Sequence, residues 1–177
     1  MLKKGERGDG MDKLAVLRQY FGFPAFRAGQ QTLIDAVLSG RDALGVMPTG
    51  GGKSLCYELP ALLLPGMTLV VSPLISLMKD QVMALRNAGI PAGCINSSMS
   101  LDELRETYRD ARYGAYKLLY VAPERLLTDG FCSLAQELEI PLVAVDEAHC
   151  ISEWGHDFRP EYRRIRPIIN DIGAAPL

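Results

Sequence analysis

A glycine-rich run in the first third of the chain has the composition of a phosphate-binding loop. Residues 47–54 read Met-Pro-Thr-Gly-Gly-Gly-Lys-Ser and stand between an apolar run and a helical pattern. The glycines let successive backbone N–H groups point at one centre, and a helix start adds positive potential. Lys53 would reach the β- and γ-phosphates of a nucleotide, and the Ser54 hydroxyl would hold Mg²⁺. The full pattern has glycine where Met47 stands, and a plain glycine turn is the alternative. The candidate nucleotide ligands here are Met47, Pro48, Thr49, Gly50, Gly51, Gly52, Lys53 and Ser54.

Two adjacent carboxylates, Asp146 and Glu147, follow a second apolar run. Adjacent residues of a strand face opposite ways, so the two acids can do different work. Asp146 would hold Mg²⁺, directly or through water, and Glu147 would orient and deprotonate an attacking water. Taken alone, the pair could be a helix N-cap, and His149 could be structural. With the phosphate loop upstream, the motifs predict a nucleoside triphosphatase whose catalytic residues are Lys53, Asp146, Glu147 and His149.

Five short apolar runs must position these motifs, namely residues 43–47, 68–72, 92–96, 118–122 and 142–146. They are apolar nearly throughout, which is typical of strands buried on both faces of a parallel sheet. Helical patterns separate them, so we expect a three-layer α/β fold of the RecA-like P-loop type with a mainly parallel central sheet. Such sheets bind ligands at the carboxyl ends of their strands, so the motifs should share one rim.

A first helix is expected between Asp12 and a break at Phe23-Pro24, and further helices at residues 29–39, 53–64, 75–88, 101–113 and 160–171. Asp12 would cap the first helix, whose apolar positions Leu14, Leu17 and Phe21 share one face. Ser100 and Glu103 form a capping box before the fifth.

The composition narrows the class of protein. The 177 residues are 48% hydrophobic and 23% charged, which is typical of one soluble globular domain. The net charge of −2 argues against a wholly basic nucleic-acid coat protein but leaves a local basic groove open. No apolar run is long enough to span a bilayer. Four widely spaced cysteines lack a metal-ligand spacing, so we expect reduced thiols and no zinc. Residues 1–11 are expected to be a flexible extension before a domain of residues 12–177.

Together these motifs resemble those of superfamily 2 helicases, and residues 14–169 resemble the RecQ family of DNA helicases. Residues 21–30, Phe-Gly-Phe-Pro-Ala-Phe-Arg-Ala-Gly-Gln, are similar to the family's motif 0. The resemblance implies that Gln30 reads the adenine edge, Arg27 supports the nucleotide and Phe23 stacks on the base. The family often has tyrosine where Phe23 stands, so here stacking is kept and a hydroxyl contact is lost.

Three further stretches resemble the DNA-contacting motifs of that family. Residues 70–81 are similar to motif Ia, residues 120–126 to a later motif that grips the DNA backbone, and residues 146–159 to an aromatic-rich loop. By resemblance, this loop senses single-stranded DNA and couples it to ATP hydrolysis. The alternatives are solvated helix charges and a small aromatic core. The candidate nucleic-acid ligands are Ser72, Pro73, Ser76, Lys79, Asn96, Pro123, Arg125, Trp154, His156, Phe158 and Arg159.

The resemblance implies the N-terminal ATP-binding lobe of an ATP-dependent DNA helicase that moves 3′ to 5′ and serves recombination and repair. It implies ATP and Mg²⁺ as cofactors, single-stranded and forked DNA as substrates, and a cytoplasmic location, at the nucleoid in a bacterium. We expect the second RecA-like lobe, the zinc module and the winged helix to lie in the same parent protein, outside this chain. The lobe alone is expected to bind nucleotide weakly and not to unwind DNA. An RNA helicase of the same superfamily and a non-hydrolysing nucleotide-dependent binding module stay open.

Overall fold

A parallel sheet forms the centre of the molecule. The computed structural model describes residues 12–48, 50–151 and 165–171. Within that range four strands pair in the order β2-β3-β1-β4, where the strands are β1 (Thr68–Val71), β2 (Ala92–Ile95), β3 (Leu118–Val121) and β4 (Leu142–Val145). Val71 is in register with Val121 and Val145, and Ile95 with Val121, so all four carboxyl ends lie at one edge. The predicted parallel α/β sheet is confirmed.

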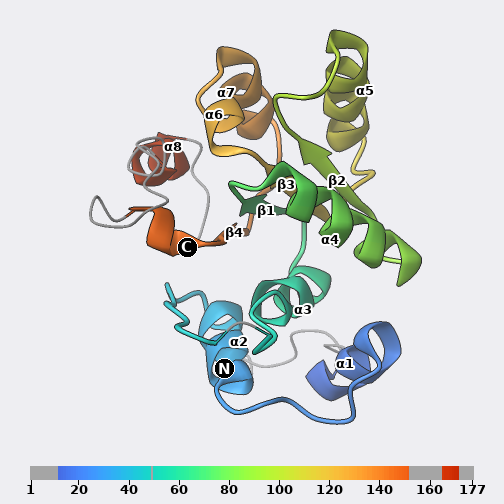
Figure 1. Cartoon of the computed structure of the whole chain (residues 1–177), viewed down its shortest axis with the longest axis vertical. Helices are drawn as coiled ribbons and strands as arrows, with labels where there is room; N and C mark the ends of the chain where they lie inside the picture. The colour runs from blue at the N-terminus through green and yellow to red at the C-terminus, as the bar shows by residue number, and fades with distance from the viewer. Residues whose placement is uncertain (1–11, 49, 152–164, 172–177) are drawn as a thin grey trace, which may run out of the picture.

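Helices cover both faces of the sheet (Figure 1). One face packs against α3 (Leu55–Leu63) and α4 (Ile75–Asn87). The other packs against α5 (Leu101–Arg112), α6 (Pro123–Leu126), α7 (Asp129–Gln136) and α8 (Ile165–Asp171). On the side away from the sheet, α3 also packs against α1 (Lys13–Phe21) and α2 (Gln30–Leu38), with which it shares a small core. The result is the three-layer arrangement that the sequence predicts, with an N-terminal helix pair beyond it.

Local capping signals in the sequence are confirmed. The Asp12 side chain accepts from Leu14 N, and Ser100 and Glu103 form both halves of a capping box. The apolar stripe of α1 differs from the prediction, because Val16 and Leu17 are buried whereas Leu14 is exposed. The last helix ends at Asp171 as expected, and its expected start at Pro160 lies outside the described residues.

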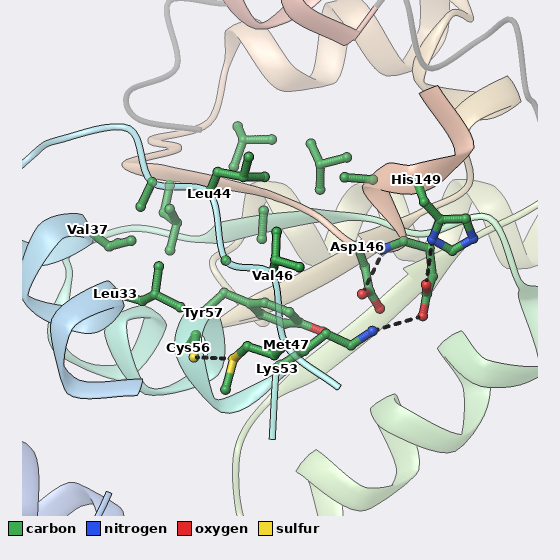
Figure 2. Close-up of a pocket in the computed structure, with 18 residues that line it drawn as sticks. Leu33, Val37, Leu44, Val46, Met47, Lys53, Cys56, Tyr57, Asp146 and His149 are labelled. Atoms are coloured by element: carbon green, nitrogen blue, oxygen red, sulfur yellow. Dashed lines mark hydrogen bonds and ion pairs between the residues drawn. The ribbon is translucent and has the colours of Figure 1, made fainter. Parts of the chain in front are cut away.

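The prediction of a strand at residues 43–47 is wrong. This segment makes no ladder with β4, and Leu44 and Val46 are 81% and 91% exposed. A cavity of about 460 Å³ separates it from β4, as Figure 2 shows for Leu44 and Val46. The segment lies instead against α2, where a Cβ built on Gly45 would come 2.7 Å from Leu33 Cδ1. Apolar composition indicates a tendency to be buried, but it does not supply the strand-to-strand hydrogen bonds.

Two short helices, α6 and α7, were not expected from periodicity, because each is at most two turns long. Their local signals are Pro123 in the first turn of α6 and the Thr128 hydroxyl, which accepts from Phe131 N at the start of α7. Among the described residues, no helix combines the length and the apolar character needed to cross a membrane.

Candidate active site

The glycine loop folds into a compact turn at the start of α3. Gly50 and Gly52 have φ of 75° and 78°, and Gly51 N donates to Pro48 O at 2.9 Å. A Cβ on Gly51 would lie 2.8 Å from Pro48 O, and one on Gly52 would lie 2.5 Å from Gln30 Nε2. Glycine is therefore required here for backbone conformation and for close approach. Pro48 is exposed, and Thr49 lies outside the described residues.

The segment between α1 and α2 contacts this loop. Gln30 is only 2% exposed. Its Oε1 accepts from Arg27 N at 2.8 Å, and its Nε2 donates to Gly52 O at 3.1 Å. Arg27 Nη1 donates to Gly50 O at 2.5 Å, and Arg27 Cζ lies 6.0 Å from the Phe23 ring centre. These residues line a cavity of about 330 Å³ together with Lys53 and Ser54. Contact of Gln30 with an adenine edge stays a prediction.

The two acids lie in a turn just after β4 rather than within the strand. Asp146 N donates to Val71 O at 2.9 Å, which extends the ladder by one residue, and Asp146 is 8% exposed. Glu147 follows with φ of 50°, and its N–H donates to Asp146 Oδ1 at 2.9 Å. The different directions of the two carboxylates thus come from left-handed backbone at Glu147, and not from strand alternation.

Burial raises the pKa of the Asp146 carboxyl above its ordinary value, and the Glu147 charge acts in the same direction. The Glu147 N–H and the Lys53 and His149 charges oppose that rise. A nearby cation therefore favours the ionised form of this carboxyl, as a metal ligand requires.

The loop and the acid pair meet through Lys53. Lys53 Nζ lies 3.6 Å from Glu147 Oε1, and Glu147 Oε2 lies 3.1 Å from His149 Nδ1 (Figure 2). Lys53 lines both cavities, the one beside Phe23 and the one beside β4. The four residues predicted to be catalytic thus share one site, although nearly a hundred residues separate the loop from the acids.

Polar side chains that the motifs did not single out surround this site. Gln81 Nε2 donates to Ser54 Oγ at 3.3 Å, and the Tyr57 hydroxyl donates to Gln81 Oε1 at 3.0 Å. Burial raises the pKa of Glu58 to about 7, although Tyr120 donates to its Oε1 at 3.4 Å. Helical spacing could have pointed to two of these side chains, because Tyr57 and Glu58 lie within four residues of Ser54 on α3.

The donor set at this site suits Mg²⁺. Magnesium is usually held by one or two protein oxygens together with substrate phosphates and water. A hydroxyl at Ser54 and a carboxylate at Asp146 match that pattern, whereas no group of three His, Cys, Asp or Glu residues able to hold a metal occurs in the described part of the chain. The tight glycine turn supplies the phosphate-binding half of the same site.

The candidate nucleic-acid residues fall into four groups. Ser76 and Lys79 are exposed on α4. Arg125 is half-buried, and its Nε donates to Asn96 O at 3.2 Å. The buried members, whose side chains shape the rim, are Ser72, Pro73, Asn96 and Pro123. The remaining candidates, which lie outside the described residues, are Trp154, His156, Phe158 and Arg159.

A parallel α/β sheet with an acid pair at its carboxyl edge, together with a glycine loop whose lysine contacts that pair, defines the class of P-loop nucleotide-binding domains. Within that class, the DEAD/DEAH box helicase family matches residues 27–174, and the chain belongs to this family.

Two bacterial relatives are both RecQ helicases. The chain is 51% identical over 164 residues to the ATP-dependent DNA helicase RecQ of Bacillus subtilis, which covers 92% of this chain and 28% of that protein. It is 50% identical over 164 residues to the ATP-dependent DNA helicase RecQ of Haemophilus influenzae, covering 93% and 26%. The resemblance to RecQ helicases is thus confirmed, and the chain spans about a quarter of the length of these relatives.

Solved helicase structures share the fold. The DUF1998 helicase MrfA superposes with a TM-score of 0.69 at 19% identity, covering 93% of this chain and 28% of that one. A hypothetical ATP-dependent RNA helicase from Sulfolobus tokodaii superposes with a TM-score of 0.63 at 22% identity, covering 90% of this chain and 54% of that one. At these identities the likeness concerns the fold alone.

Proposed function

We propose that residues 12–177 are the first RecA-like, ATP-binding lobe of a RecQ-like, ATP-dependent DNA helicase. The observation that carries this proposal is the contact between Lys53 of the glycine loop and Glu147 of the acid pair, 3.6 Å apart at the carboxyl edge of the sheet. Identities of 51% and 50% to two RecQ helicases support DNA over RNA as the nucleic acid.

ATP would lie along the loop with its phosphates against the N–H groups of residues 50–52 and Lys53. Ser54 and Asp146 would hold Mg²⁺, which neutralises phosphate charge when bound. Phe23, Arg27 and Gln30 are already gathered at the other end of the loop, where a base would lie. The 330 Å³ cavity there is of the size that ligand sites usually have.

Glu147 would orient the attacking water and accept its proton. It is 23% exposed and has two cationic or ionisable neighbours, Lys53 and His149. Phosphates bound at the loop would compete for Lys53, which leaves Glu147 paired with His149 and open to water. Phosphoryl transfer needs alignment and charge neutralisation above all, and these residues provide both.

The parent protein would move 3′ to 5′ on single-stranded DNA, act on forked DNA in recombination and repair, and work in the cytoplasm, at the nucleoid in a bacterium. A second RecA-like lobe of the same parent would close over the nucleotide. Ser76 and Lys79, exposed on α4 at the same edge of the sheet, support a DNA-facing surface. Comparing ATPase stimulation of the parent by single-stranded DNA and by RNA tests the choice of nucleic acid.

The test of nucleotide binding uses a fluorescent ATP analogue with Mg²⁺ and the purified chain. Lys53→Ala should weaken binding by roughly 10- to 100-fold, the usual effect of losing hydrogen bonds to a charged group. Glu147→Gln should keep the affinity, while any phosphate release falls to the buffer level. Arg105→Ala removes a cation from the exposed face of α5 and serves as the control. Equal binding by Lys53→Ala and the unchanged chain would contradict the proposal.

A further inference from the structure

Ser54, Tyr57 and Gln81 form a hydrogen-bonded cluster that joins the start of α3 to α4. Both ends of the Gln81 amide have partners, since Nε2 donates to Ser54 Oγ at 3.3 Å and Oε1 accepts from the Tyr57 hydroxyl at 3.0 Å. All three residues are half-buried. Ser54 and Tyr57 are three residues apart, so they lie on the same side of the helix and can contact one amide together.

Tyr57 determines which way the Gln81 amide points. The Tyr57 hydroxyl donates its hydrogen to the carbonyl oxygen of Gln81 at 3.0 Å. This leaves the amide nitrogen facing Ser54, where it occupies one of the two lone pairs on Oγ.

The packing of α4 keeps Gln81 in place. The buried stripe of this helix, Met78, Val82 and Leu85, packs against the sheet. Ser54 stands at the N-cap of α3, but its hydroxyl makes no capping bond to the helix backbone. Its hydroxyl instead accepts a hydrogen bond from Gln81, a side chain of another helix.

We propose that Gln81 is a positioning residue that holds the Ser54 hydroxyl in the orientation needed for Mg²⁺. This rests on the proposed function, because it assigns a residue to support the metal ligand of the same site. Gln81 lies outside the glycine loop and the acid pair, and it acts only through Ser54.

The experiment measures binding of a fluorescent ATP analogue to the 177-residue chain, once with Mg²⁺ and once with EDTA. Gln81→Leu should weaken binding roughly fivefold with Mg²⁺, the effect of one ordinary hydrogen bond, and leave binding in EDTA unchanged. Tyr57→Phe, which leaves Gln81 in place but removes its orienting donor, should lower affinity in the same Mg²⁺-dependent way. Thermal unfolding without nucleotide shows whether each variant is folded. Met83→Gln changes an exposed position of α4 and is the matched control.

A double-mutant comparison tests whether Gln81 acts on Mg²⁺-dependent binding through Ser54. In a Ser54→Ala background, Gln81→Leu should cause no further loss, because its partner is already absent. Equal weakening of Gln81→Leu with Mg²⁺ and with EDTA, no weakening at all, or full additivity with Ser54→Ala would each overturn the proposal. If the unchanged chain binds the analogue in neither condition, the proposed function itself fails.

Discussion

Three carboxyl side chains at the site have different surroundings, so they can have different chemical roles. Asp146 is buried, Glu147 contacts both Lys53 and His149, and Glu58 accepts a hydrogen bond from the Tyr120 hydroxyl. Burial raises the pKa of the Asp146 carboxyl above its ordinary value, whereas the Glu147 side chain is 23% exposed. The carboxylate that can meet water is thus Glu147, and the one shielded from water is Asp146.

Glu58 should make stability depend on pH. Burial is the main cause that raises its pKa to about 7, and the Asp146 charge contributes. The folded chain therefore keeps a proton that the unfolded chain releases near the ordinary pKa of about 4.3. Unfolding free energy should fall as pH rises from about 4.5 to 7 and level off above, by up to roughly 3 kcal/mol.

Glu58→Gln should remove this part of the slope, and urea unfolding at several pH values measures it. Asp146 also has a raised pKa, so the informative quantity is the difference between variant and unchanged chain at each pH. Glu124→Gln, at an exposed position of α6, should run parallel to the unchanged chain. Parallel curves for Glu58→Gln as well would show that Glu58 is not protonated in the folded state.

At the scale of elements, the parallel sheet brings the site together. The carboxyl ends of four parallel strands lie at the same edge, and four of the five apolar runs predicted that edge correctly. The acid pair follows β4 at this edge, and the glycine loop reaches it through the contact between Lys53 and Glu147. Residues 43–47 are also largely apolar, yet they do not pair with β4. The contacts of Gln81 were not predictable, because they depend on how α3 and α4 are rotated against each other. The contact of Gln30 with the loop was not predicted either, because the resemblance gave Gln30 only a role in binding adenine.

The glycine loop can be tested with two matched glycines. Gly52 and Gly114 have φ of 78° and 71°, but only a Cβ on Gly52 meets a neighbour, Gln30 Nε2 at 2.5 Å. Alanine at either position should cost about 1–2 kcal/mol of unfolding free energy for left-handed backbone. Gly52→Ala should in addition lose binding of the ATP analogue, whereas Gly114→Ala should keep it. Loss of binding in both variants, measured with matched unfolding curves, would show that strain alone explains the result.

At the scale of the whole molecule, the site lies where two packed units meet. The helix pair α1 and α2 packs on α3, and α3 packs on the sheet (Figure 1). The candidate base-binding residues belong to the first unit and the acid pair to the second, with the glycine loop between them. A nucleotide bound along the loop would contact both units, so its binding should stabilise the fold as a whole.

The central claim is that one triphosphate and one divalent ion join the glycine loop to Asp146. The direct measurement is a crystal structure of the chain with a non-hydrolysable ATP analogue and Mn²⁺, whose anomalous scattering locates the ion. We predict a single strong peak between Ser54 Oγ and the Asp146 carboxylate, contacting each directly or through one water, with Lys53 turned from Glu147 to the phosphates. An ion bound elsewhere, or Ser54 and Asp146 too far apart to share it, would contradict the account.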